Sequence, residues 1–136
     1  MYQKVLMTLL ILGILIFATV ASAEIKFFEG VGEYYMENSD ETLAQAQDKA
    51  KLAAELKIIE QAQVHIQSYS EMNNSNLTQD EIVSITAGII NVTNVKYSLK
   101  TENDGILLMC AVVTAEIDTD KISELVEREI NRRVAE

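Results

Sequence analysis

Residues 42–69, TLAQAQDKAKLAAELKIIEQAQVHIQSY, decide the fold of this chain. Small and apolar residues recur in this stretch at steps of three and four, which is the spacing of one helical face. Polar residues fill the opposite side, and Ser39 or Asp40 can cap the start. The stretch therefore predicts one long amphipathic helix. Its expected core face comprises Leu43, Ala46, Ala50, Ala53, Ala54, Ile58 and Ala62, widened by Leu56, Ile59, Val64 and Ile66.

The alanines of this helix allow two interpretations. Alanine is the best helix former, so its abundance needs no other reason. Alternatively, the small side chains let the helix axis approach a flat neighbour closely. The preceding segment, residues 26–35, offers such a surface, because Gly30 and Gly32 share one face of a strand. We expect the first half of the helix to pack over these two glycines.

Two further helices are predicted downstream. Thr78-Gln79-Asp80-Glu81 matches the capping box T-x-x-E and precedes an apolar run that ends near Gly88 or Asn91. Asp118-Thr119-Asp120 is expected to cap the last helix. The expected apolar faces are Ile82, Ile85 and Ile89 on the first of these helices, and Ile122, Leu125, Val126, Ile130 and Val134 on the second.

Residues 92–101 and 106–117 are predicted to form a β-hairpin, because Asn103-Asp104-Gly105 between them is a turn signal. Residues 106–117 are apolar on both sides, so we expect them in the centre of the sheet, paired with residues 25–36. The element order is strand, helix, helix, strand, strand, helix. That order predicts a single α+β domain over residues 24–136, with a small antiparallel sheet of about three strands and the long helix packed across one face.

The N-terminus has the three parts of a secretory signal peptide. Lys4 makes the start positive, residues 5–20 are almost unbroken hydrophobe, and Ala21-Ser22-Ala23 matches an A-x-A cleavage site. A retained membrane anchor is the alternative, but the apolar run is short for a spanning helix. We expect residues 1–23 to be a signal peptide and the rest to be exported, to the periplasm or the cell envelope. No cysteine stands at the cleavage site, where Ala23 is followed by Glu24, so no lipid anchor is expected, and the membrane is reached only through the uncleaved signal peptide.

The chain carries a formal charge of −10, and the loss of Lys4 on cleavage changes this to −11. An acidic surface repels phosphate backbones and anionic lipid headgroups, so nucleic-acid binding is not expected. The single cysteine, Cys110, allows no intramolecular disulfide. The domain must therefore rely on an apolar core, for which its length is sufficient.

Residue types suited to catalysis are not clustered in this sequence. His65 is the only histidine and cannot make a zinc site alone. Cys110 lies mid-strand among apolar residues, with no adjacent base or cation to lower the pKa of its thiol. Glu29 and Glu33 share a strand face but lie about 13 Å apart, which does not suit a glycosidase pair. We expect no catalytic residue, no metal and no cofactor, and the chain is not expected to be an enzyme.

Two regions are candidates for binding. Ile106, Leu108, Cys110 and Val112 form an apolar row on the sheet face assigned to solvent. Either the second or third helix covers this row, or the row is a partner surface for an envelope protein or another copy of the chain. The alternative function is small-molecule or ion binding in a cleft beside the polar loop of residues 69–77, using Tyr69, Ser70 and the asparagines.

Several segments together are similar to a known family. The run Gly30-x-Gly32, the alanine-rich helix, Ser68-Tyr69-Ser70 and residues 82–90 before a hairpin resemble the lipoprotein-20 family. The N-terminal domain of the flagellar assembly protein T is similar. The resemblance covers most of the chain after residue 23 and implies an α+β module of the export compartment. Nothing at Ala23-Glu24 can be acylated as in the lipoprotein members. We therefore expect an exported, non-catalytic cell-envelope module that acts through protein–protein contacts.

Overall fold

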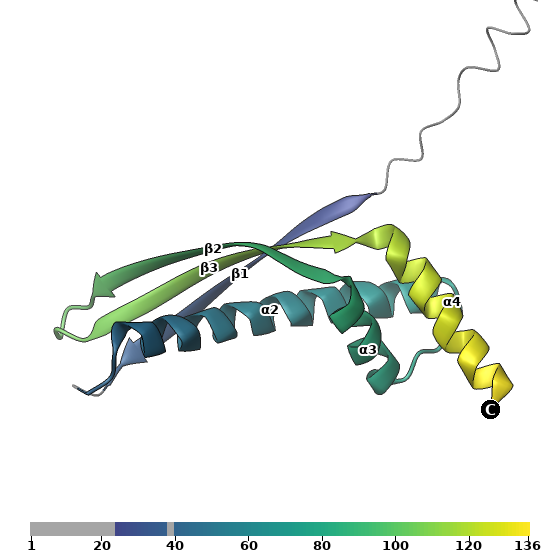
Figure 1. Ribbon diagram of the computed structural model, residues 1–136, viewed down its shortest axis with the longest axis horizontal. Helices are drawn as coiled ribbons and strands as arrows, with labels where there is room; N and C mark the ends of the chain where they lie inside the picture. Colours follow the sequence, from purple (N-terminus) through teal and green to yellow (C-terminus); the bar gives the residue numbers. More distant parts are fainter. Residues whose placement is uncertain (1–23, 38–39) are drawn as a thin grey trace, which may run out of the picture.

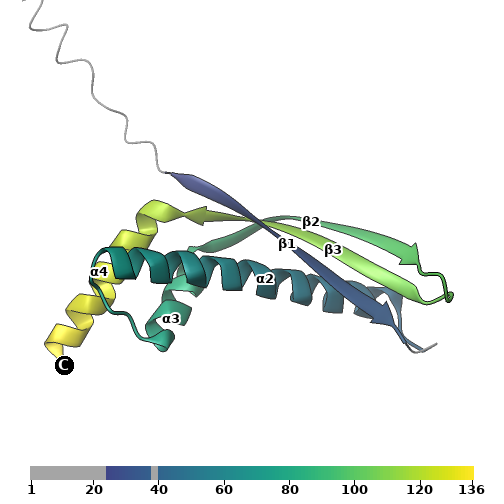
Figure 2. The same cartoon turned by 180° about the vertical axis from the view of Figure 1, so that it is seen from behind.

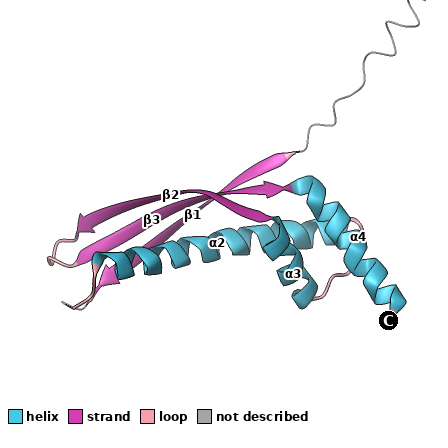
Figure 3. Cartoon of the chain, viewed as in Figure 1, coloured by secondary structure: helices cyan, strands magenta, loops and turns pink. Residues whose placement is uncertain are grey.

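The computed structural model describes residues 24–37 and 40–136, so the predicted signal peptide lies outside the described residues. The predicted α+β fold is confirmed: a three-stranded antiparallel sheet carries a 30-residue helix across one face (Figures 1 and 3). The predicted order of elements is also confirmed. The elements are β1 (Ile25–Met36), α2 (Leu43–Met72), α3 (Gln79–Ile89), β2 (Ile90–Thr101), β3 (Leu107–Asp118) and α4 (Thr119–Ala135).

β3 is the central strand of the sheet, as its two apolar sides predict. It pairs antiparallel with β1 along its whole length, for example Gly30 with Val113. On its other side it forms the predicted hairpin with β2. Gly105 closes that hairpin with a φ of 80°, a conformation that suits glycine. β2 begins earlier than predicted, at Ile90, directly after the last residue of α3.

The close approach predicted between α2 and the glycines of β1 is confirmed. A Cβ atom on Gly30 would overlap the carbonyl oxygen of Ala54, and one on Gly32 would overlap the carbonyl oxygen of Ala50. The helix backbone itself therefore lies against the strand. Glycine on β1 and alanine on α2 are both required, because a larger side chain on either element would push the helix away from the strand.

The buried stripe of α2 is narrower than predicted and repeats every four residues. An α-helix turns once per 3.6 residues, so each step of four rotates the stripe by about 40°. Its first half faces the sheet and packs with Met109 and Val113. Its second half faces α3 and α4 and packs with Ile85 and Ile122. The buried residues are Ala46, Ala50, Ala54, Ile58, Ala62, Ile66 and Ser70, whereas Leu43, Leu56 and Val64 are exposed, contrary to prediction.

Side-chain caps begin the helices, although not always at the predicted residue. α2 is capped by Thr42, whose hydroxyl accepts from the backbone amide of Gln45, and not by Asp40. Ser39, the other predicted cap, lies outside the described residues. The capping box of Thr78 and Glu81 is present at the start of α3. Asp118 caps α4 as predicted. At the far end of α4, the predicted core residue Val134 is 83 % exposed, because that end extends beyond its neighbours.

The described helices all lie on the same side of the sheet. α2 runs beneath β1 and β3, and α3 and α4 descend from one end of the sheet on that side (Figures 1 and 2). The opposite side of the sheet is therefore left without a helical layer from residues 24–37 and 40–136.

Candidate interaction surface

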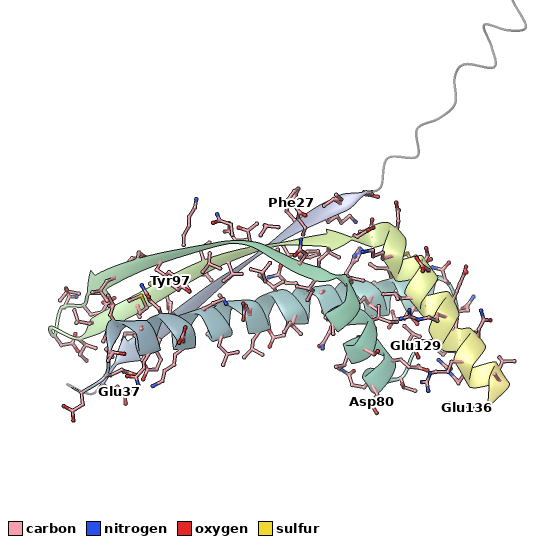
Figure 4. The ribbon with its side chains drawn as sticks, viewed as in Figure 1. Phe27, Glu37, Asp80, Tyr97, Glu129 and Glu136 are labelled. Atoms are coloured by element: carbon pink, nitrogen blue, oxygen red, sulfur yellow. The ribbon has the colours of Figure 1, made fainter. Side chains whose placement is uncertain are left out.

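The side of the sheet away from α2, which we call the outer face, carries a row of large apolar side chains on β1. Phe27 is 66 % exposed, and Figure 4 shows it on the side opposite α2. Ile25, Val31 and Tyr35 follow the same strand alternation and are also exposed. Glu29 and Glu33 alternate with Val31 and Tyr35 on this face, so the row is apolar at four of its six positions. Exposed apolar residues gathered on one face mark contact surfaces. The outer face comprises Ile25, Phe27, Glu29, Val31, Glu33 and Tyr35 of β1, Leu108, Cys110, Val112, Thr114 and Glu116 of β3, and Asn94, Lys96, Ser98 and Lys100 of β2.

Of the apolar row predicted on the central strand, Leu108, Cys110 and Val112 lie on this face, whereas Ile106 precedes β3 and belongs to the hairpin connection. Ile106 is 41 % exposed and Val112 is half-buried, whereas Leu108 and Cys110 are buried. The expectation that a later helix covers the row is wrong, because α3 and α4 lie on the other side of the sheet (Figure 1). Its role as a partner surface stays a prediction.

The burial of Leu108 and Cys110 is explained by their neighbours in the sheet. Side chains directly opposite each other on one face of an antiparallel pair are about 5 Å apart and shield one another. Tyr35 and Lys100 lie on either side of Leu108 in the register. Glu33 and Ser98 flank Cys110 in the same way. The exposed row on β1 was not among the predicted surfaces, although strand alternation places Phe27, Val31 and Tyr35 on the face opposite Gly30 and Gly32.

Charge is distributed unevenly across the outer face. Glu29 and Glu33 lie on β1, and Lys96 and Lys100 lie on β2, with the apolar residues of β3 between them. All four side chains belong to exposed residues. The salt bridges within residues 24–37 and 40–136 involve other groups. The face therefore has an acidic margin and a basic margin.

The free edge of β1 is partly closed by α2. The Lys57 ammonium donates to the carbonyl oxygen of Val31 at 2.6 Å, and the Gln61 amide donates to the carbonyl oxygen of Glu29 at 3.1 Å. Unpaired carbonyl groups on an edge strand are the groups that an added strand would use. Because these two are occupied, the outer face offers more to a partner than this edge does.

A hollow of about 660 Å³ lies beside that edge and contains His65. Burial is the main cause that lowers the pKa of His65 below 6.5. The nearby charge of Lys26 lowers it further, and the charge of Glu24 opposes the shift. The ring of His65 lies 6.4 Å from that of Phe28, in a tilted arrangement. The hollow is open to solvent, and two of its polar side chains already donate to β1 carbonyl groups. Its lining residues are Phe28, Lys57, Glu60, Gln61, Val64, His65 and Ser68.

A second hollow, of about 520 Å³, lies between the start of α3 and the end of α4. Arg133 donates to both carboxylate oxygens of the buried Glu81, at 3.0 and 2.8 Å. The pKa of Glu81 is lowered mainly by the hydrogen bond that its carboxylate accepts from the Thr78 backbone amide. Burial raises this pKa, and the hydrogen bond and charge of Arg133 lower it further. The pair of Glu81 and Arg133 thus ties α3 to α4, and the neighbouring Arg132 pairs with Glu129 within α4.

The loop after α2, where a ligand cleft was considered, uses its polar groups for its own fold. The Ser70 hydroxyl accepts from the backbone amide of Leu77 at 3.2 Å. The Asn73 amide donates to the carbonyl oxygen of Tyr69 at 2.8 Å. Asn74 and Asn76 adopt positive φ angles, which asparagine tolerates in tight turns. The hollows described above are lined by other residues.

The described part of the chain has neither a clustered metal site nor a helix suited to span a membrane. It contains no group of three or more His, Cys, Asp or Glu side chains that could hold a metal ion. Across residues 24–37 and 40–136, no helix has the length and apolar character needed to cross a bilayer. No protein-family model, curated protein or solved structure matches this sequence.

Proposed function

We propose that this chain is an exported, non-catalytic module of the cell envelope that works through protein–protein contacts at its outer face. The observation that carries the proposal is the exposed row of Phe27, Val31 and Tyr35 on a sheet face that none of the described helices covers. Burying such a row against a protein is favourable by roughly 25 cal/mol per Å² of apolar surface. A partner surface is therefore the simplest role for this face.

Export is supported by the sequence of residues 1–23. A positive start, an apolar run and Ala21-Ser22-Ala23 are the features that the export machinery recognises. The resemblance to the lipoprotein-20 family, which is part of this proposal, agrees with the same compartment. The acidic charge of the chain keeps the module soluble outside the membrane.

The polar residues favour a contact module over an enzyme. Lys57 and Gln61 bind strand carbonyl groups, Arg133 binds Glu81, and Ser70 binds the loop backbone. These groups hold elements together, so they are not free to bind and activate a substrate. Cys110 is buried and has flanking side chains on both sides.

Photo-crosslinking in exporting bacterial cells tests the proposal. A photoreactive phenylalanine analogue replaces Tyr35 on the outer face of the full chain, and the envelope fraction is recovered after illumination. We expect a discrete adduct of higher mass in that fraction. Attack on neighbouring groups requires contact, so the adduct reports a protein on this face.

The matched control places the same analogue at Leu52, which is 58 % exposed on α2. Leu52 lies two residues from both Ala50 and Ala54, so it is on the side of the helix opposite the buried stripe and faces away from the sheet. We expect no discrete adduct there. Equal labelling at both positions, or a chain that stays in the cytoplasm, would contradict the proposal.

A further inference from the structure

We propose that the occupant of the outer face is the outer face of a second copy of this chain, related by a two-fold axis that runs parallel to the strands above β3. This inference rests on the proposed function and names its partner. The resulting dimer has two sheets packed face to face, with the helices on the outside.

The order of the strands supplies the first argument. The acidic strand β1 and the basic strand β2 are the two edges, and Leu108, Cys110 and Val112 of β3 separate them. Glu116 of β3 lies toward one end of the face, at the level of Phe27, and is the one acidic group near the axis among these outer-face positions of β3. A two-fold axis parallel to the strands places β1 of each copy over β2 of the other. Acidic margins then meet basic margins on both sides of the axis, which is favourable and sets the orientation.

The register of the strands supplies the second argument. Val31 of β1 and Lys96 of β2 lie at the same level along the sheet, because both pair with Val112. Lys96 of the second copy is therefore expected above Val31, between Glu29 and Glu33. Residues on one face of a strand are spaced about 7 Å apart, which a lysine side chain can span. By the same reasoning, Lys100 of the second copy lies one step from Glu33.

The alternative symmetric arrangement is disfavoured by charge. A two-fold axis in the interface but perpendicular to the strands places β1 over β1 and β2 over β2. Glu29 and Glu33 then face the same acidic strand of the other copy, and the lysines face lysines. Bringing like charges together in an interface raises the free energy of the complex by roughly several kcal/mol. We therefore reject this arrangement.

The size of the face sets the expected strength. Three strands of 12 residues cover roughly 600 Å² per copy at the usual strand spacing and rise. The two copies together then bury roughly 1,200 Å², which is the lower end of specific interfaces. We expect a dimer with a dissociation constant of about a micromolar or weaker, not an obligate one.

Sedimentation equilibrium on the chain recovered from exporting cells tests this dimer. The wild type is expected to show a monomer–dimer equilibrium. Glu29→Lys with Glu33→Lys makes both margins basic, and Lys96→Glu with Lys100→Glu makes both acidic. Each double variant should lose at least about tenfold in association, because like charges now meet. An equal mixture of the two variants should regain association, since every basic margin then meets an acidic one.

The matched control is Glu124→Lys with Glu127→Lys, at two exposed positions on α4. It changes the net charge as Glu29→Lys with Glu33→Lys does, but away from the outer face. It should associate like the wild type. A wild type that is monomeric at about millimolar concentration, or double variants that associate as the wild type does, overturns the second-copy inference.

The crosslinking experiment separates this inference from the proposed function. An adduct at twice the mass of the exported chain supports the second copy. An adduct of any other mass, with a monomer in sedimentation, overturns the second copy and leaves the contact module standing. The lack of any adduct from Tyr35 overturns both.

Discussion

Gly32 lies directly against the backbone of Ala50. A Cβ atom on Gly32 would overlap the Ala50 carbonyl oxygen, and the backbone nitrogen of Ala54 is almost as close. A helix backbone cannot move away from a strand without losing the whole packed layer between them. This contact, repeated one step along at Gly30 and Ala54, fixes the distance between α2 and the sheet.

Gly32→Ala is therefore expected to destabilise the fold strongly. The added methyl group meets backbone atoms, which cannot rotate out of its way. We expect a loss of about 3 kcal/mol or more in the free energy of unfolding, at the upper end of overpacking effects. Urea denaturation followed by circular dichroism measures it. Gly88→Ala is the matched control, because its Cβ would meet only the flexible end of Leu125 at 3.3 Å. A change at Gly32 no larger than at Gly88 would show that the contact is not as close as described.

The sequence predicted this contact because it depends on local patterns. The two-residue spacing of the glycines and the recurrence of alanine at Ala46, Ala50 and Ala54 are visible in a single segment each. The hairpin and the pairing of β1 with the doubly apolar β3 were predictable for the same reason. The capping box at Thr78 was predicted as well, since it is written in four consecutive residues.

The burial of individual side chains was harder to predict, because it depends on where elements distant in the sequence lie. Leu56 and Val64 were expected to widen the core face but are exposed, because each lies two residues from its buried neighbours and so on the other side of the helix. The stripe stays narrow because only one side of α2 meets the sheet, α3 and α4. Cys110 was assigned correctly to the outer face, but its burial comes from side chains on two other strands. The row of Phe27, Val31 and Tyr35 could have been identified as a surface by alternation once Gly30 was assigned to the core.

Glu81→Gln is expected to weaken the link between α3 and α4. The substitution keeps an acceptor for Thr78 but removes the charge that binds Arg133. Because Arg133 is partly exposed and screened, we expect a cost of about 1–2 kcal/mol at pH 7, measured by thermal or urea unfolding. Glu129→Gln, which removes a carboxylate paired with the exposed Arg132, should cost less than about 0.5 kcal/mol.

The same pair gives a pH dependence of known sign. Folding lowers the pKa of Glu81 from its ordinary value of 4.5, so its charge stabilises the folded state fully above pH 4.5. That contribution is lost as the pH falls through the lowered value. The stability difference between wild type and Glu81→Gln should therefore shrink on acidification below pH 4.5. A difference that stays constant down to about pH 2 would show that the charge of Glu81 is not the cause.

Truncation of the two adjacent phenylalanines on β1 should affect different properties, stability for Phe28 and association for Phe27. Phe28 packs against both core clusters, whereas Phe27 is 66 % exposed on the outer face. We expect Phe28→Ala to cost about 2–4 kcal/mol and Phe27→Ala less than about 0.5 kcal/mol in the unfolding of dilute, monomeric protein. Phe27→Ala should instead weaken association of the outer face. Equal destabilisation by the two substitutions would mean that the strand alternation on β1 is wrongly assigned.

Cys110 should react slowly with thiol reagents even though no described helix lies over it. Only exposed thiolates react readily, and Cys110 is 5 % exposed between the strands that flank it. The matched probe is Ser98→Cys in a Cys110→Ser background, because Ser98 lies opposite Cys110 on the exposed strand β2. We expect Cys110 to react at least about tenfold more slowly than the cysteine introduced at residue 98, and at the same rate once urea unfolds the chain. Rates that match in the folded state would show that neighbouring strands do not shield the centre of the outer face. In that case the exposed apolar area of the outer face would be larger than the burial of Leu108 and Cys110 implies, and a tighter dimer would be expected.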